Sequence, residues 1–520
     1  MPLPQTLLLP AGLRALSTTA RLPRNMVEPL RVLFVASECT PYAKTGGLGD
    51  VVADLPKALR KMGHDARVLI PFYAQIDRAK HGIKSASTHC IHMGAGIEHW
   101  VGLHTARLDD EVPVWFLDYD AYFNRPGIYD GPGGHYLDNA FRFALLSKAA
   151  LQICKDAQWI PHVIHVHDWP SALVPAFLKT WDRVNSPLAS TASVLTIHNI
   201  GYQGKYDATY LLPYCGFGPE HFTPDILEDY GKVNLLKAGL WFADALTTVS
   251  PTHAKEILTP AGGMGLAPYL NRRAADLSGI LNGVDYAHWN PATDKHLPAR
   301  FSADDLAGKA ICKADLQKHF ALEVSDTLPL FGIVSRFAPQ KGFNLLRDAL
   351  PAALNGMLMQ FVVLGSGDAD TEDFFRALQA AYPGRVGAHI GFNIELSHLI
   401  EAGSDFFLMP SLYEPCGLNQ IYSLKYGTLP IVRATGGLED TVENYEEATG
   451  KGTGFKFSEA SASALYYAIG WAVSTWFDRP QHIARLRKQA MAKNFDWADS
   501  ARKYAGVYQH ALANRSRLPP

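Results

Sequence analysis

Two segments of this 520-residue sequence have residues suited to binding phosphate. Each lies between a predicted strand and a predicted helix; one carries glycines and a lysine, the other an arginine and a lysine. The loop Lys44-Thr-Gly46-Gly47-Leu-Gly-Asp50 follows an apolar run and precedes a segment with helical periodicity. Its glycines can bring backbone N–H groups and a positive helix end against a phosphate, and Lys44 adds a mobile charge. The loop is neither a dinucleotide fingerprint nor a P-loop, so by itself it also fits an ordinary turn with a solvated lysine.

The second segment, Ser335-Arg336-Phe-Ala-Pro-Gln-Lys341-Gly342, stands between a predicted strand and a predicted helix. The Arg336 guanidinium can donate two parallel hydrogen bonds to a phosphate, and the Lys341 ammonium can bind a phosphate as a point charge. The alternative is a pair of surface cations near a helix start. The helix dipole disfavours cations at that place, which favours a functional role.

A carboxylate and a run of amides make a third segment, Glu414-Pro-Cys416-Gly417-Leu418-Asn419, again between a strand and a helix. A carboxylate beside such amides can hold sugar hydroxyls or stabilise positive charge, while the amides accept a phosphate. Considered singly, Glu414 is also typical of a helix N-terminus. Cys416 is more typical of a small buried side chain than of a nucleophile.

Histidines end two further apolar runs, at His165-Val-His167 and at His198. No carboxylate or cysteine set accompanies them at a metal-ligand spacing, so we expect no metal there. Asp138 precedes a long helical segment, where an aspartate can serve simply as an N-cap.

Short apolar runs alternate with amphipathic segments through the whole chain, which predicts α/β architecture with parallel sheets covered on both faces. Ligands of such sheets bind beyond the carboxyl ends of the strands. The predicted strands are 32–36, 66–70, 112–117, 163–166, 194–197, 246–249 and a short one with its turn in 278–285, then 328–334, 360–364, 386–390, 406–409 and 429–432; the predicted helices include 137–153, 233–242, 343–354 and about 480–513.

Length and composition suggest at least two domains and an enzyme of ordinary globular type. We expect a leader at 1–28, a first Rossmann-like domain at 29–285, a second at 286–490, and a C-terminal helix at 491–520 that crosses back to the first. The leader is rich in Arg, Ser and Thr, as a transit peptide is, and Met26 could be an alternative start. We expect a disordered leader on a cytoplasmic protein, with a plastid or another organelle as the alternative.

The net charge, the cysteine spacing and the lengths of the apolar runs argue against several classes of protein. A net charge of −2 argues against a nucleic-acid binder. The six cysteines are scattered singly, which argues against a disulfide framework or a zinc site and favours a reducing compartment. No apolar run approaches the roughly 20 residues of a membrane span. The oligomeric state stays open.

Taken together, these segments resemble bacterial glycogen synthases and plant starch synthases, glycosyltransferases of the GT-B type with two facing Rossmann-like domains. The resemblance runs from Arg31 almost to the C-terminus. It rests on ten segments in the family's order: Lys44–Asp50, Tyr136–Asn139, His165–Trp169, Thr196–Gly204, Lys237–Leu240, Leu281–Asp285, Ser335–Gly342, Glu414–Leu418, Leu424–Gly427 and Thr435–Asp440.

The resemblance implies transfer of glucose from ADP-glucose to the non-reducing end of an α-1,4-glucan such as glycogen, with retention and without metal or cofactor. Arg336 and Lys341 would neutralise the diphosphate, Glu414 would hold the glucose, and His167 would lie beside it. It further implies that Lys44, Gly46, Gly47, Cys416, Gly417, Leu418 and Asn419 contact the donor, that Asp138, Asn282 and Asp50 line the donor or acceptor side, and that Phe392 stacks on the base.

Two departures from the family pattern concern single residues. Ile421 stands where some related enzymes carry a second glutamate, and Phe123 where bacterial enzymes often have a tyrosine near the donor. The competing interpretations are a UDP-glucose-dependent glucan synthase and a catalytically inactive glucan-binding protein. The second would predict loss of Lys44, Arg336, Lys341 or Glu414, and all four are present.

Overall fold

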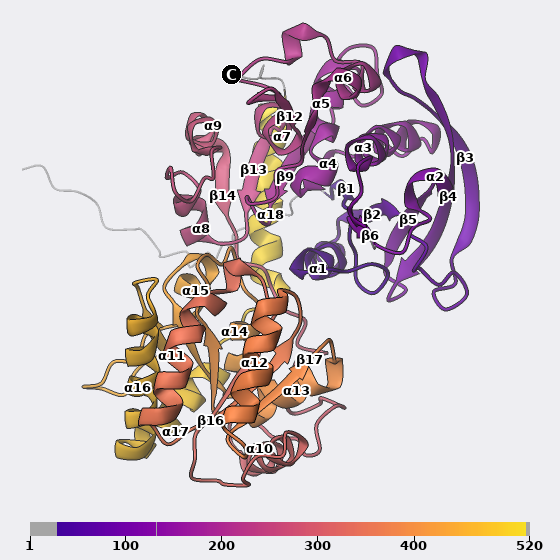
Figure 1. The fold of residues 1–520 in the computed structure, drawn as a ribbon. Helices are drawn as coiled ribbons and strands as arrows, with labels where there is room; N and C mark the ends of the chain where they lie inside the picture. The colour runs from indigo at the N-terminus through magenta and orange to yellow at the C-terminus, as the bar shows by residue number, and fades with distance from the viewer. Residues whose placement is uncertain (1–28, 132, 516–520) are drawn as a thin grey trace, which may run out of the picture.

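The computed structural model describes residues 29–131 and 133–515. In that part of the chain the strands gather into two large sheets (Figure 1). The predicted leader at 1–28 lies outside the described residues. The first sheet has the order β14-β13-β9-β8-β1-β2-β5-β4-β3. Its strands are β1 Arg31–Val35, β2 Asp65–Pro71, β3 Lys84–His92, β4 Glu98–Leu108, β5 Val112–Asp118, β8 Val163–His167, β9 Ala192–Ile197, β13 Ala245–Thr248 and β14 Leu277–Gly279.

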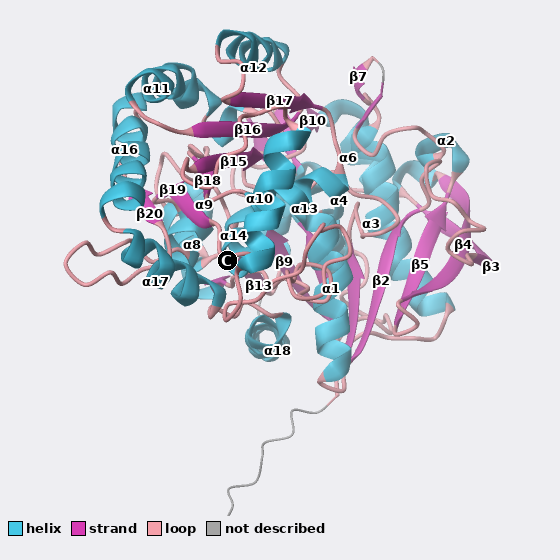
Figure 2. Cartoon of the chain, turned by 90° about the horizontal axis from the view of Figure 1, so that it is seen from below, coloured by secondary structure: helices cyan, strands magenta, loops and turns pink. Residues whose placement is uncertain are grey.

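The second sheet has the order β17-β16-β15-β18-β19-β20, and every pairing in it is parallel. Alternate side chains of its strands enter separate cores (Figure 2). One lies under α11 (Phe343–Gly356), α12 (Ala369–Ala381) and α16 (Ala462–Asp478), and the other under α10 (Ala307–His319) and α13 (Ile394–Gly403). Both faces are therefore covered, as strands that are apolar throughout require. The strands are β15 Leu330–Val334, β16 Gln360–Gly365, β17 Val386–Ile390, β18 Phe406–Met409, β19 Leu429–Arg433 and β20 Phe455–Phe457.

Helices connect the strands of both sheets. In the first half they are α1 Gly47–Lys61, α2 Asp120–Phe123, α3 Asn139–Asp156, α4 Asp168–Ser171, α5 Leu173–Thr180, α6 Ala208–Cys215, α7 Leu235–Phe242, α8 Pro251–Glu256 and α9 Ala267–Arg272. The second half has α10 Ala307–His319, α11 Phe343–Gly356, α12 Ala369–Ala381, α13 Ile394–Gly403, α14 Asn419–Lys425, α15 Gly436–Thr441, α16 Ala462–Asp478, α17 Pro480–Met491 and α18 Trp497–Asn514. Short pairings complete the first half: β6 Asp130–Gly131 with β7 Gly134–His135, and β10 Lys205–Asp207, β12 Lys232–Asn234 and β11 Glu228–Asp229.

The predicted α/β architecture is confirmed, with one correction at the edge of the first sheet. Strands β3 and β4 pair antiparallel with each other, and β4 pairs antiparallel with β5, so this sheet is mixed rather than wholly parallel. Neither β3 nor β4 was among the predicted strands; most of β3 is exposed, and β4 is buried only at scattered positions, so neither shows a continuous buried run.

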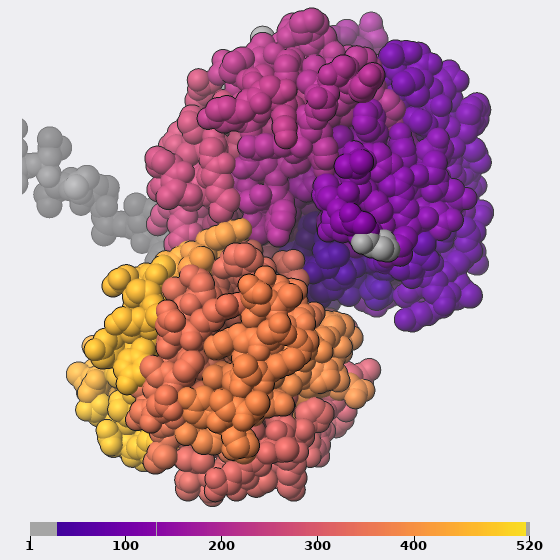
Figure 3. Space-filling view, viewed as in Figure 1, coloured from indigo at the N-terminus to yellow at the C-terminus, as the bar shows by residue number. Residues whose placement is uncertain are grey.

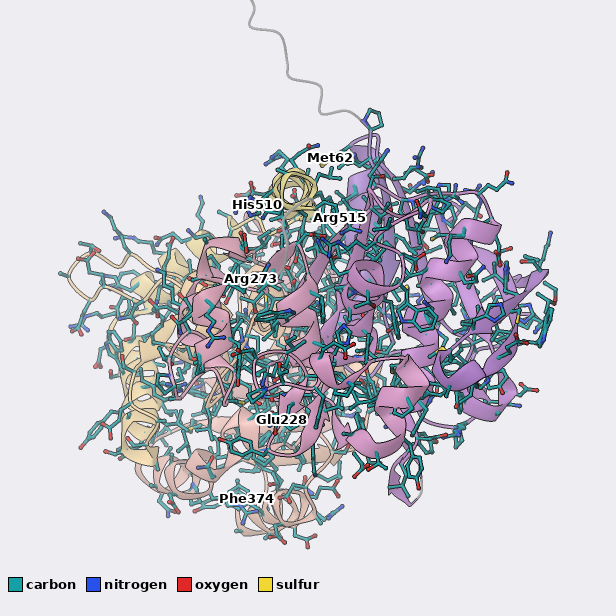
Figure 4. All side chains as sticks on the ribbon, turned by 90° about the horizontal axis from the view of Figure 1, so that it is seen from above. Met62, Glu228, Arg273, Phe374, His510 and Arg515 are labelled. Carbon is teal, nitrogen blue, oxygen red and sulfur yellow. The ribbon has the colours of Figure 1, made fainter. Side chains whose placement is uncertain are left out.

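The C-terminal helical segment, predicted as one piece over about 480–513, is divided in two. Helix α17 ends at Met491, and α18 begins at Trp497 and packs against α1, β9 and β13 of the first half. Tyr504 and Tyr508 of α18 are buried in the first core, and the Tyr508 hydroxyl contacts His165 Nδ1 at 2.9 Å. Figure 4 shows the other end of α18, with His510 and Arg515 near Arg273.

Contacts between α8 of the first half and α15 of the second join the halves. Asp440 accepts bonds from the backbone N–H and the hydroxyl of Thr252, at 2.8 and 2.7 Å. Glu256 accepts from the Thr435 hydroxyl at 2.9 Å and the Gly436 amide at 3.0 Å. The halves meet at a waist that is notched on one side (Figure 3). The predicted boundary at 285–286 falls between the last strand of the first sheet and the first of the second.

Within residues 29–131 and 133–515, no helix combines the length and the apolar character that crossing a membrane demands.

Candidate active site

The centre of the candidate site is an ion pair between two predicted site residues of the second half. Lys341 Nζ donates to Glu414 Oε2 at 2.7 Å, and the Ser411 hydroxyl donates to the same oxygen at 2.9 Å. Lys341 follows β15 and Glu414 follows β18, and these strands are parallel neighbours. The carboxyl ends of the two strands thus bring together residues 73 positions apart.

Glycines shape the backbone around this pair. Gly342 has φ +74°, and a Cβ there would lie 2.0 Å from the Pro410 carbonyl oxygen. Gly436 and Gly437 lie against the other side of the Glu414–Cys416 segment. A Cβ on Gly436 would lie 2.0 Å from the Glu414 carbonyl oxygen, and one on Gly437 would lie 2.0 Å from the Cys416 carbonyl oxygen. Only glycine permits such close backbone approach, so the Glu414 segment is held from both sides.

The predicted amide group lies at the start of α14. Gly417 has φ +71°, and the first amides of the helix have no acceptor within it. The Asn419 side chain donates to the Val334 carbonyl at 2.6 Å and so fixes the helix start to the end of β15. Burial, opposed by a hydrogen bond from the Asn282 backbone, raises the pKa of the Cys416 thiol to about 12. Cys416 is therefore a packing residue and not a nucleophile at neutral pH.

The glycine-rich loop of the first half faces that helix start. A Cβ on Gly47 would lie 3.6 Å from the Leu418 side chain. The buried Glu38 holds the loop in this place. Its carboxylate accepts from the Thr45 amide at 2.6 Å, the Thr45 hydroxyl at 2.7 Å and the Gly46 amide at 3.2 Å. The Gly46 amide, predicted as a phosphate contact, is thus already directed at Glu38.

Lys44 and Asp50 are paired with each other in this structure. Lys44 Nζ donates to the two carboxylate oxygens of Asp50 at 2.7 and 2.6 Å. The Lys44 side chain is 47% exposed. The ammonium can therefore reach an incoming anion only by leaving Asp50 or sharing its donors.

The histidines at the carboxyl ends of β8 and β9 form a buried pair. His167 Nδ1 and His198 Nε2 lie 3.0 Å apart, so one of the two nitrogens donates to the other. Burial lowers the pKa of both imidazoles, that of His198 to about 3, so both are neutral near pH 7. His167 Nε2 is buried and has no partner among the described residues. A neutral His167 cannot supply a cation to the site, but this nitrogen can contact a sugar hydroxyl.

Hydrogen bonds lead from His198 to the chain neighbours of the central pair. Asp168 Oδ1 accepts from the His198 amide at 2.7 Å, and burial raises the pKa of Asp168 to about 7. The adjacent Asn199 donates to Gln340 Oε1 in the other half at 3.2 Å, and Gln340 donates to the Tyr413 carbonyl at 3.1 Å. Gln340 and Tyr413 directly precede Lys341 and Glu414 in the chain.

Asp138, Arg336 and Phe392 stand apart from this cluster, and Asn282 reaches it only through the hydrogen bond of its backbone to the Cys416 thiol. Arg125 NH1 and NH2 donate to the two carboxylate oxygens of Asp138 at 2.6 and 2.5 Å, and Asp138 makes no side-chain cap on α3. Arg336 is exposed at the end of β15. Phe392, after β17, is 87% exposed. Asn282 is buried, and its Oδ1 is without a partner in the described part of the chain.

Sequence reasoning missed Glu38 and the contacts that join the halves. Glu38 comes three residues after β1, which is the place where polar side chains of a parallel sheet face a ligand cleft, and that position was the available signal. The bonds of Asn199 and Glu256 to the second half depend on how the halves meet, and no local pattern encodes them.

Residues 31–272 match the family model of the starch synthase catalytic domain, and residues 315–491 match that of glycosyl transferases group 1. Glycogen synthase 1 of Geobacter metallireducens is 47% identical over 491 residues, which cover 94% of this chain and 97% of that protein. The chain belongs to the glycogen synthase family.

Further relatives of this glycogen synthase family member agree. Glycogen synthase of Treponema denticola is 44% identical over 495 residues, 94% of this chain and all of that one. The catalytic domain of starch synthase IV from Arabidopsis thaliana, solved bound to ADP and acarbose, superposes with a TM-score of 0.86 at 33% identity, covering 93% of this chain and 100% of that one. Sucrose-phosphate synthase from Thermosynechococcus elongatus has a TM-score of 0.56 at 18% identity, covers 93% of this chain and 99% of that one, and shares the fold.

The predicted resemblance, the GT-B fold and the assignment as a glycosyltransferase are thereby confirmed.

Proposed function

We propose that this glycosyltransferase moves glucose from ADP-glucose to the non-reducing end of an α-1,4-glucan such as glycogen, with retention at the anomeric carbon. The observation that carries the proposal is the 2.7 Å Lys341–Glu414 pair, together with the start of α14, which the glycine-rich loop of the opposite half faces. The ADP and acarbose bound by the starch synthase IV domain support an ADP-linked donor.

The chemistry follows from the charges that the reaction separates. Cleavage of a glucosyl–phosphate bond builds negative charge on the diphosphate and positive charge on the sugar. Lys341 has three N–H donors and directs one at Glu414, which leaves donors for phosphate oxygens. The exposed Arg336 and the amides at the start of α14 act on the same anion. Preorganised donors of this kind stabilise a leaving group without reorganisation during the reaction.

Glu414 serves the sugar end. Lys341 and Ser411 both donate to Oε2, so Oε1 can accept from glucose hydroxyls. In this proposal His167 Nε2 contacts another hydroxyl, and Asn282 and Asp138 line the acceptor side. Lys44 shares its ammonium between Asp50 and the donor, and Phe392 stacks on the base. The Glu414 carboxylate already accepts from Lys341 and Ser411, so we assign it to holding the sugar and assign retention to attack on the face that the diphosphate leaves.

Two alternatives make different predictions. A UDP-glucose-dependent synthase would keep the central pair and differ around Phe392. An inactive glucan-binding protein would bind glycogen without turnover. The intact Lys341–Glu414 pair favours an enzyme. We also place the reaction in the cytoplasm, consistent with six cysteines that are all free; cell fractionation tests that placement.

The test is glucose incorporation into glycogen from ADP-glucose and, separately, from UDP-glucose. We expect ADP-glucose to be preferred, and the product to be digested by an α-1,4-specific glucosidase. Lys341→Ala should lower turnover by about 10²- to 10³-fold, the range for loss of one preorganised donor. Lys456→Ala is the matched control, because Lys456 pairs with Glu439 at 2.8 Å in the same half and is similarly covered.

Three results would count against the proposal. Preference for UDP-glucose would overturn the donor assignment. Equal losses in the two lysine variants would overturn the role of Lys341. Glycogen binding without incorporation from either donor would favour the binding protein.

A further inference from the structure

A group of potential metal ligands lies on the β3–β4 hairpin, at the outer edge of the first sheet (Figure 1). In the antiparallel register His92 stands opposite Glu98, and Cys90 stands opposite Trp100. Side chains alternate between the faces of a strand, so Cys90, His92 and Glu98 share one face. The hairpin therefore gathers a thiol, an imidazole and a carboxylate that are not adjacent in sequence.

Two of the three side chains are already paired. His92 Nδ1 lies 3.1 Å from Glu98 Oε1. One ligand atom from each residue can be chosen so that all three lie within 4.8 Å of one another. Zinc binds sulfur at about 2.3 Å and nitrogen or oxygen at about 2.0–2.2 Å, so the ligand atoms of a tetrahedral site are roughly 3.3–3.8 Å apart. Small rotamer changes suffice to close the triangle.

The surrounding charge also suits a cation. The Glu98 carboxylate and that of Asp156, which pairs with His89 at 2.7 Å, both act on the Cys90 thiol. A thiolate between two carboxylates is electrostatically unfavourable alone and favourable around a divalent cation. A set of sulfur, nitrogen and oxygen ligands selects zinc over magnesium or calcium, which prefer oxygen alone.

We propose that Cys90, His92 and Glu98 form a three-ligand site for Zn²⁺, with the fourth position open to water or an external ligand. The site is separate from the candidate active site, since β3 is four strands from β1, about 19 Å at the usual strand spacing. A bound ion would link β3 to β4 and stabilise the exposed edge of the sheet. The sequence pattern suggested no zinc site, because strand register and not a Cys-x-x-Cys spacing brings these ligands together.

The experiment uses the full-length, untagged protein after dialysis against a chelator. Zinc is titrated in competition with a chromophoric chelator, Co²⁺ is used as a spectroscopic substitute, and alkylation of Cys90 is followed by mass spectrometry. The other five cysteines are buried, so Cys90 is the thiol expected to react first. We expect one equivalent of zinc per chain, a thiolate-to-cobalt charge-transfer band, and protection of Cys90 by Zn²⁺ but not by Mg²⁺.

Variants separate this site from adventitious binding. Cys90→Ser and His92→Ala should each abolish stoichiometric zinc binding, and Cys90→Ser should abolish the cobalt band. His288→Ala is the control, because His288 is an exposed histidine 2.7 Å from a carboxylate, that of Asp285, without a thiol in the pair. Circular dichroism and metal-free glucosyl transfer of Cys90→Ser should match those of the unmodified chain, which shows that the variant folds.

The proposal is overturned if zinc binds equally well to Cys90→Ser and His92→Ala, or if the cobalt complex lacks the thiolate band. It is also overturned if His288→Ala loses zinc to the same extent as the hairpin variants. Absence of any zinc binding by the folded, unmodified protein would have the same meaning.

Discussion

Glu38→Gln should loosen the glycine-rich loop and weaken donor binding while leaving the protein folded. The buried carboxylate accepts from the amide and hydroxyl of Thr45, from the Gly46 amide, and from the Tyr129 hydroxyl at 2.7 Å. Glutamine keeps the shape but turns an NH₂ group toward some of these donors. A hydrogen bond to a charged acceptor contributes about 1.5–3 kcal/mol, and leaving a buried donor unsatisfied costs a similar amount.

In Glu38→Gln the ordered conformation of the loop is therefore destabilised by about 2 kcal/mol. Binding of the donor must supply this free energy to order the loop again. At 1.4 kcal/mol per factor of ten, the KM for ADP-glucose rises by up to about thirtyfold. The kcat should change little, because the loop is ordered again once the donor is bound. Initial rates at saturating glycogen and calorimetric titration with ADP measure the two quantities.

Tyr129→Phe is the matched control for Glu38→Gln, since it removes one donor to the same carboxylate and leaves the bonds to the loop intact. Its donor KM should stay near that of the unmodified enzyme. If Glu38→Gln left the KM unchanged, or if Tyr129→Phe raised it equally, the carboxylate would not be what orders the loop.

Three further predictions concern single residues. The pKa of His198 is lowered to about 3, so between about pH 6.5 and that value the unfolded chain binds a proton at His198 that the native chain does not. His198 should therefore make stability fall by about 1.4 kcal/mol per unit as pH falls, and the buried His167 acts with the same sign. His198→Gln should reduce the slope by about that amount in denaturation at pH 5, 6 and 7. The raised pKa of Asp168 acts with the opposite sign in the same window, and an unchanged slope in the variant would refute the assignment to His198. Gly437→Ala should destabilise by about 2–4 kcal/mol because its Cβ meets a carbonyl oxygen at 2.0 Å, whereas Gly506→Ala, with open space on α18, should stabilise by about 0.5–1 kcal/mol; equal melting shifts would contradict this. Phe392→Ala should weaken ADP binding about tenfold, at the low end of base stacking, and should not change the melting temperature without ADP; unchanged affinity would remove Phe392 from the base site.

The parallel strands were predictable because burial on both faces leaves runs of apolar residues, as in β16 and β18. Lys341 and Glu414 could be placed together for the same reason, since each follows such a run and the ends of parallel strands share an edge. Strands β3, β4 and β20 were missed: β3 is mostly exposed, β4 is buried only at scattered positions, and β20 has three residues. The exposure of β3 also hid the ligand cluster of the hairpin, which only the register reveals.

Contacts that depend on loop conformation and tertiary packing were beyond sequence reasoning. Lys44 was expected to be available to the donor, but its position relative to Asp50 is set by the first turn of α1 and the preceding loop. Asp138 stands at the N-cap position of α3, but its carboxylate forms an ion pair with Arg125 instead of capping the helix. Tertiary packing brings these two residues together. A pattern identifies residue types at strand ends and does not choose among their possible partners.

The position of α18 has a consequence for synthesis of the protein. Tyr504, Tyr508 and Ala511 belong to the core of the first half, although the last strand of that sheet ends at Gly279. The ribosome must therefore make the whole second half before the first can complete its core. At ~5–20 residues per second this leaves an apolar surface open for some tens of seconds. The nascent first half is then a natural client for chaperones, and a truncated message would yield a product that cannot finish folding.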